Sequence, residues 1–259
     1  LHPSRMPTGR WPSDHPLVFS QQLAVNEAWN SLKSSAGLFA VNGPPGTGKT
    51  TMLRDIVAAV VTQRAEVSAD LGSQAFGHKE SARIGDAWVP FYRLHEALNG
   101  HSIVVASSNN GAVENVTREL PGFTAVPRAS AEQAAYYPQV ASQVIGKKAW
   151  GLIAAPLGKS VNRAKFLKAF WWGGAVDSQQ GCEAGGLRAH FKKRQAMPEI
   201  TRARWQQSLK KFREAQAREK HARQLVCQVA DRPQKMAALV TLAAQIKSDM
   251  DASVQATQR

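Results

Sequence analysis

The chain has 259 residues, 43% of them hydrophobic and 20% charged, which is enough apolar content for a core and excludes a wholly disordered protein. No apolar run approaches the roughly 18 residues that a membrane span needs, so we expect a cytoplasmic protein with no membrane contact. The net charge of +14 favours contact with a polyanion, although Lys and Arg on solvated helices would explain the same charge.

The N-terminal part of the chain divides into a lead-in, a helix and a strand. Residues 1–16 contain four prolines and are predicted to be irregular. Apolar residues recur at helical spacing from Phe19 to Leu32, which predicts a helix. Residues 38–41 form a short apolar run that we expect to be a buried strand.

A glycine-rich loop follows this strand and leads into a predicted helix over residues 50–61. The segment Gly43–Thr50 fits the pattern GxxxxGK[ST], whose glycines let backbone N–H groups point at phosphate oxygens. The ammonium group of Lys49 would reach the β- and γ-phosphates, and the hydroxyl of Thr50 would ligate Mg²⁺. We therefore expect ATP and Mg²⁺ as cofactors, bound by Gly43, Pro44, Pro45, Gly46, Thr47, Gly48, Lys49, Thr50 and Thr51, with Lys49 as the catalytic residue.

Two more strands are predicted downstream, at residues 102–107 and 151–155, with a helix over residues 113–120 after the first of them. Between the glycine loop and these strands, residues 66–90 are polar and indicate an insertion at the edge of a sheet, and residues 91–98 suggest a short helix. Strands that alternate with helices predict an α/β fold with a parallel sheet covered on both faces, a P-loop NTPase sheet that is incomplete in this chain.

The C-terminal part is predicted to be a basic helical hairpin. Two long helical patterns, at residues 199–230 and 234–252, are separated by Pro233. Residues 186–235 carry 14 Lys and Arg against 4 Asp and Glu, a net charge of +10. This charge fits a solvated helix face, a surface for a phosphate backbone, or a docking site for a partner protein.

These patterns give three predicted parts. They are an irregular lead-in at residues 1–16, a partial P-loop motor domain at residues 17–170 and the helical hairpin at residues 171–259.

Two segments beside the loop resemble superfamily 1 helicases. The first, Phe19–Val25, is similar to the glutamine motif of that superfamily, in which a Gln side chain offers a donor and an acceptor to the adenine edge. Gln21 stands at the matching place, and Gln22 is the alternative. A pair of glutamines on a helix is otherwise surface polarity, so the position of the pair before the loop carries the resemblance.

The second segment, Ile103–Val116, looks like motif Ia in the branch that holds the nonsense-mediated-decay RNA helicases and their DNA-processing relatives. There a strand ends in a turn that opens a helix and holds a nucleic-acid phosphate. The resemblance implies Ser108, Asn109 and Asn110 as nucleic-acid contacts and single-stranded DNA or RNA as a partner. A looser resemblance at residues 150–159 adds Gly158, Lys159 and Asn162 as candidates, although an ordinary strand exit would explain the same residues. Trp171 and Trp172 could stack on bases, but packing in a core or an interface is the commoner role of such a pair.

One motor part is missing from the pattern. The family ends an apolar strand in Asp-Glu to position Mg²⁺ and the attacking water, and this sequence contains no such strand. If the resemblance holds, that acid and the arginine finger lie beyond Arg259, and the fragment binds ATP but hydrolyses it poorly. The expected function is the ATP-binding part of an ATP-dependent helicase or translocase. The alternatives are a remodelling ATPase of the AAA+ type and a nucleotide-binding module without motor activity.

Overall fold

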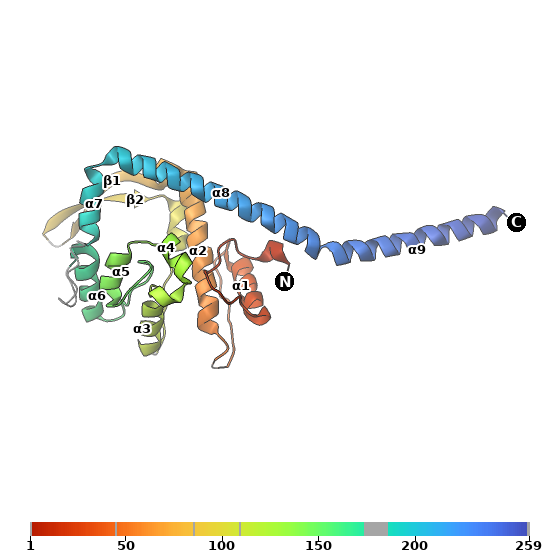
Figure 1. Ribbon diagram of the computed structural model, residues 1–259, viewed down its shortest axis with the longest axis horizontal. Coiled ribbons are helices and arrows are strands. Elements are labelled where there is room, and N and C mark those ends of the chain that lie inside the picture. Colours follow the sequence, from red (N-terminus) through yellow and green to blue (C-terminus); the bar gives the residue numbers. More distant parts are fainter. Residues whose placement is uncertain (1, 45, 85, 109, 174–185, 258–259) are drawn as a thin grey trace. The chain divides into compact units, whose positions relative to one another are not determined.

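The structure is a computed structural model that describes residues 2–44, 46–84, 86–108, 110–173 and 186–257 (Figure 1). Its α-helices are α1 (Phe19–Leu32), α2 (Lys49–Leu71), α3 (Asn110–Glu119), α4 (Arg128–Gln133), α5 (Pro138–Ile145), α6 (Ser160–Leu167), α7 (Leu187–Gln195), α8 (Pro198–Ala230) and α9 (Arg232–Thr257). Its strands are β1 (Phe76–Ile84) and β2 (Ala87–Leu94). Short helical turns are η1 (Pro3–Arg5), η2 (Gly72–Ala75), η3 (Glu96–His101), η4 (Phe123–Ala125) and η5 (Lys168–Trp172).

Contacts divide the chain into two units. One unit holds residues 7–209, and the other holds residues 1–6 together with residues 210–259. The predicted boundaries after residues 16 and 170 come from sequence patterns and not from contacts, and they stay a prediction.

The two helices that flank the glycine loop form as the apolar spacing predicts. α1 has the predicted bounds, whereas α2 begins at Lys49 and continues ten residues beyond the predicted end, to Leu71. Gly72 ends α2 with a positive φ of 54°, a backbone conformation that glycine adopts without steric cost.

The main core of residues 7–209 brings the lead-in onto α2. Its buried members are Trp11, Val57, Leu120, Val126, Ala131 and Trp150. The rings of Trp11 and Trp150 meet edge to face with centroids 5.7 Å apart. Each indole N–H is satisfied by a backbone carbonyl, Trp11 by that of Ala125 at 2.9 Å and Trp150 by that of Leu120 at 2.8 Å. The lead-in is therefore part of the core, although the sequence predicted only an irregular segment.

The three predicted parallel strands are wrong for the described residues. The segments 38–41, 102–107 and 151–155 have no strand partners there, apart from one isolated bridge at Gly151. The side chains of Leu38 and Val104 are 95% and 89% exposed. A strand needs a hydrogen-bonded neighbour on at least one side, and the described residues supply none to these apolar runs.

The sheet that the described residues do form is an antiparallel hairpin of β1 and β2. The hairpin lies where the sequence predicted a polar insertion over 66–90 and a helix over 91–98, and the predicted helix is wrong for residues 91–94. β2 is rich in aromatic and β-branched residues (Trp88, Val89, Phe91 and Tyr92), and this composition favours a strand over a helix.

The long C-terminal helices are confirmed, but the hairpin between them is not. Figure 1 shows α9 leading on from α8 instead of folding back against it. Backbone hydrogen bonds continue through the junction, from the N–H of Asp231 to Cys227 at 2.9 Å and from the N–H of Lys235 to Asp231 at 3.0 Å. Pro233 lies at the start of α9, where its missing N–H interrupts no bond of the helix. Antiparallel packing would bury the apolar side chains of both helices, and most of them are exposed instead.

The first six residues are bound to the end of α8. Nε2 of His2 lies 3.0 Å from a carboxylate oxygen of Asp231. The guanidinium group of Arg223 donates to the backbone carbonyls of Pro3 and Met6, both at 2.7 Å. No helix within the described ranges is long and apolar enough to cross a membrane.

Candidate nucleotide-binding site

The glycine loop runs directly into α2 and uses left-handed backbone at two positions. Gly46 and Gly48 have φ angles of +83° and +76°, which only glycine adopts readily. The Thr47 hydroxyl closes the turn between them by donating to the carbonyl of Pro44 at 2.9 Å. Pro45 lies outside the described residues. Glycine at these positions lets the loop turn tightly enough to present its backbone to a ligand.

Lys49 folds back over this loop. Its ammonium group donates to the carbonyl of Gly43 at 2.6 Å and to that of Pro44 at 2.8 Å. Thr50 and Thr51 follow on the first turn of α2 with exposed side chains. A movable cation, two hydroxyl groups and the N-terminus of a 23-residue helix thus lie together, a donor set that fits a polyphosphate with its Mg²⁺ ion.

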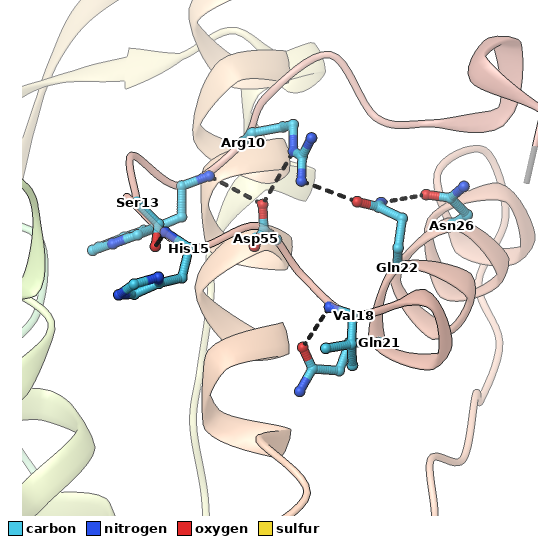
Figure 2. A network of polar contacts seen from close by, with 9 residues as sticks. Arg10, Ser13, His15, Val18, Gln21, Gln22, Asn26 and Asp55 are labelled. Carbon is cyan, nitrogen blue, oxygen red and sulfur yellow. Dashed lines mark hydrogen bonds and ion pairs between the residues drawn. The ribbon is translucent and has the colours of Figure 1, made fainter.

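Gln21 on α1 reaches the same loop. Its amide nitrogen donates to the carbonyl of Thr47 at 2.9 Å, and its amide oxygen accepts from the N–H of Val18 at 3.2 Å (Figure 2). The approach is close, since a Cβ at Gly48 would collide with the Gln21 amide nitrogen. The structure therefore brings the predicted glutamine and the predicted loop together, 26 residues apart in sequence.

Gln22, the alternative glutamine, is occupied elsewhere. It is buried, its amide oxygen accepts from the guanidinium group of Arg10 at 3.1 Å, and its amide nitrogen donates to Asn26 at 2.8 Å (Figure 2). Both ends of the Gln22 amide are thus occupied, one by Arg10 of the lead-in and the other by Asn26 within α1, which leaves Gln21 as the glutamine beside the loop.

Asp55 fastens the lead-in to α2. Its carboxylate accepts from the backbone N–H of Trp11 at 3.1 Å and lies 3.9 Å from the guanidinium nitrogen Nε of Arg10 (Figure 2). Burial raises the pKa of the Asp55 carboxyl above its usual 3.8, and the Trp11 N–H and the Arg10 charge oppose that shift. A chain of polar contacts therefore runs from α2 through the lead-in to α1.

A cavity of about 360 Å³ opens between the lead-in and the start of α2. It is lined by Arg10, Trp11, Pro12, Ser13, His15, Pro16, Leu17, Thr51, Arg54 and Asp55. Thr51 belongs both to this lining and to the turn that follows Lys49. The apolar walls of the cavity come from the lead-in, so this segment shapes the surroundings of the nucleotide loop.

The comparison with known families matches this geometry. Residues 17–253 match the profile of a family described as the AAA domain. The chain belongs to the AAA domain family. This family is part of the superfamily 1 helicase group of P-loop ATPases, whose members use a nucleotide and usually Mg²⁺. No curated protein and no solved structure matches the chain.

The predicted nucleic-acid turn of the AAA domain is only partly described. Ser108 is exposed, Asn109 lies outside the described residues, and Asn110 begins α3 with a side chain that is likewise outside them.

The looser candidates of the AAA domain lie further along the chain. Lys159 is exposed just before α6. The ring of Trp172 has the guanidinium group of Arg188 at 4.8 Å from its centroid, and Trp171 meets Phe191 edge to face at 6.2 Å. Both tryptophans that were candidates for base stacking thus already have neighbours within the chain.

Sequence reasoning missed Arg10, Trp11 and Asp55 at this site. The lead-in looked irregular because its prolines break periodicity, but its tryptophan was a sign of core packing. Asp55 left a clearer signal, because it interrupts the apolar face of the predicted helix that also carries Met52 and Ala59. A carboxylate on such a face is buried only with partners.

Proposed function

We propose that this AAA domain is the ATP-binding part of a helicase or translocase, in the branch that holds the nonsense-mediated-decay RNA helicases and their DNA-processing relatives. The observation that carries the proposal is the hydrogen bond from the Gln21 amide to the carbonyl of Thr47. It places a side chain that can read a base directly beside a loop that can hold phosphates. The match to the helicase-type family supports this proposal over a ring-forming remodelling ATPase.

The phosphate end of the nucleotide would be held by the loop and the start of α2. The Lys49 ammonium group, which lies on the carbonyls of Gly43 and Pro44, would exchange these neutral acceptors for phosphate oxygens. The left-handed glycines give the loop its turn, and the dipole of α2 adds positive potential at the same place. Thr50 would hold Mg²⁺, which neutralises phosphate charge.

The base end would enter the cavity beside Thr51. Its lining includes the apolar side chains of Pro16 and Leu17, which suit the faces of a purine ring. Gln21 has one donor and one acceptor, the pair that the adenine edge requires, and both are currently used within the chain, by Val18 and Thr47. Adenine would compete for these groups.

The track would be single-stranded DNA or RNA, with Ser108, Asn109 and Asn110 holding one phosphate of its backbone. A strand that ends in Asp-Glu is absent from the 259-residue sequence. We therefore expect this chain to bind ATP and to turn it over far more slowly than a complete motor.

Calorimetric titration of MgATP into the 259-residue protein tests the proposal. Wild-type protein is expected to bind ATP. Lys49→Ala is expected to bind it about 10- to 100-fold more weakly, because a charge-assisted hydrogen bond contributes about 1.5–3 kcal/mol.

Lys33→Ala is the matched control, because Lys33 is an exposed lysine at the end of α1 whose ammonium group contacts only Asn30 among its described neighbours. Equal affinity of the Lys49 variant and wild type, or no binding by wild type at millimolar ATP, would refute the ATP site. Steady-state hydrolysis at the speed of a complete motor would refute the expectation that this chain hydrolyses ATP slowly for want of the Asp-Glu acid.

A further inference from the structure

The β1–β2 hairpin has two faces of different composition. Strand residues alternate between faces, and the register pairs Lys79 with Tyr92 and Arg83 with Trp88. One face, here the Trp88 face, therefore consists of Lys79, Ser81, Arg83, Trp88, Pro90 and Tyr92. On it each aromatic residue stands directly across from a cation.

The opposite face is a matched contrast on the same two strands. It carries Glu80, whose carboxylate accepts from the guanidinium group of Arg93 at 3.0 and 3.1 Å. Val89 and Phe91 are its large apolar residues, each less exposed than either aromatic residue of the Trp88 face. The charge on this face is balanced within the hairpin.

The high exposure of the aromatic side chains on the Trp88 face indicates a binding surface. The side chains of Trp88 and Tyr92 are 70% and 59% exposed. A two-stranded hairpin is only marginally stable in water by itself. A ligand that covered the two exposed rings would therefore stabilise the hairpin. Contiguous exposed aromatic surface of this kind marks an interaction site.

We propose that the Trp88 face binds single-stranded nucleic acid, with bases stacked on Trp88 and Tyr92 and backbone phosphates beside Lys79 and Arg83. Binding of single strands without sequence preference combines aromatic platforms with cations along one groove or strand. The two rings are four residues apart on β2, which is about 13 Å along a strand. The proposal rests on the proposed function for the identity of the track, and it adds a second contact region far from residues 108–110 in sequence.

Charge and edge chemistry favour a nucleic acid over a protein strand. The chain carries a net charge of +14, and the carboxylate of Asp86, which lies 3.8 Å from the guanidinium group of Arg83, is fully exposed in the turn. An ion pair so exposed contributes little and exchanges readily with another anion. Pro90 removes one backbone donor from β2, and a proline in an edge strand hinders pairing with a further strand.

Anisotropy of fluorescein-labelled 20-mers of deoxythymidine and of uridine, titrated with the 259-residue protein at fixed salt, tests this surface. Trp88→Ala/Tyr92→Ala is expected to weaken binding at least tenfold, because each base that stacks on an aromatic ring contributes substantially to affinity. Val89→Ala/Phe91→Ala removes two large side chains from the opposite face of the same strand, and its binding is expected to stay within twofold of wild type.

Lys79→Gln supplies a second readout that does not depend on ring packing. It is expected to lower the slope of log K against log salt by about one unit, as the loss of one phosphate contact does. Circular dichroism and the melting temperature show whether each variant folds, and where the double variant does not, the salt slope of Lys79→Gln decides.

Equal binding by the two double variants, or an unchanged salt slope for Lys79→Gln, would overturn the proposal and leave the ATP site untouched. Wild-type protein that binds MgATP in the calorimeter but neither oligonucleotide would also overturn it and would favour a protein partner. If the wild-type protein does not bind MgATP in the calorimeter, that result would instead count against the proposed function.

Discussion

Two turns of this AAA domain each lead into a helix, and they differ in what surrounds them. The turn before α2 is held by hydrogen bonds from three side chains, those of Gln21 on α1, Lys49 on α2 and Thr47 in the turn itself. The turn before α3 follows residues 102–107, where Val104 is almost fully exposed. The nucleotide turn thus obtains its surroundings from α1, α2 and the lead-in, whereas the residues that precede the second turn are largely exposed. A site is rigid only where its neighbours are packed.

Gly48→Ala is expected to break the nucleotide turn most severely. The substitution meets a left-handed φ of +76°, and its Cβ would collide with the Gln21 amide nitrogen. Strain of about 1–2 kcal/mol, together with the loss of the Gln21 bond to the loop when its amide moves aside, predicts a loss of ATP affinity of tenfold or more. Calorimetry measures it.

Gly46→Ala is the control for that experiment, because Gly46 has a similar φ of +83° and open space where the Cβ would lie. It is expected to show the backbone strain alone. If Gly46→Ala and Gly48→Ala weaken ATP equally, the contact between Gln21 and the loop has no energetic weight.

The two neighbouring glutamines separate packing from recognition. Gln22→Ala removes the acceptor of an Arg10 N–H and the donor to the buried amide oxygen of Asn26, and it is expected to lower the free energy of unfolding by about 1–3 kcal/mol. Gln21→Ala is expected to leave the free energy of unfolding nearly unchanged and to reduce the preference for ATP over GTP. Urea denaturation and competition binding measure these effects, and the opposite assignment of effects would exchange the roles of the two residues.

Asp55 gives the region a pH dependence of known sign. Because burial raises the pKa of this carboxyl in the folded protein, the folded state holds the proton more tightly than the unfolded state. The stability contributed by this group is therefore fully present below pH 3.8 and is lost as pH rises through the raised pKa. The side chain introduced by Asp55→Asn does not ionise. The urea midpoint of this variant is therefore expected to lack the part of the pH dependence between pH 3 and pH 7 that comes from Asp55 in the wild type. Parallel curves for the two proteins would contradict it.

Ser108→Ala is the smallest expected change and probes the other turn. The residue is exposed, and a surface substitution of this kind alters the free energy of unfolding by no more than about 0.5 kcal/mol. Binding of a labelled single strand is expected to weaken only slightly, through one phosphate contact. A destabilisation as large as that of Gln22→Ala would show that the second turn is packed after all.

The helices and the glycine loop could be predicted from the sequence because their signals are local. α1 shows its apolar spacing, and Gly43–Thr50 fixes both the turn and the start of α2. The parallel strands were predicted wrongly because an apolar run such as 102–107 predicts burial but does not show whether a neighbouring strand is available for pairing. The hairpin was missed because its first strand is polar and its second is a short apolar run that contains a proline, so neither shows a clear period of two.

The polar chain of Arg10, Gln22 and Asp55 could not be predicted for a different reason. Its members are separated by up to 45 positions in sequence and meet only once the lead-in has folded onto α2. Neither length nor composition shows that the lead-in folds onto α2. The basic C-terminal helices show the reverse case, in which helix formation was predictable and the packing of the two helices was not.

The unbroken length of α2 makes the helix a lever. Its 23 residues extend about 35 Å at 1.5 Å per residue, from the glycine loop at its first turn to η2 and the hairpin at its last. A continuous helix bends gently unless a proline or an inserted group interrupts it, and the sequence of α2 contains no proline. A tilt of a few degrees imposed at the phosphate end would therefore swing the far end by an ångström or more, so the hairpin is attached where small movements at the loop are amplified.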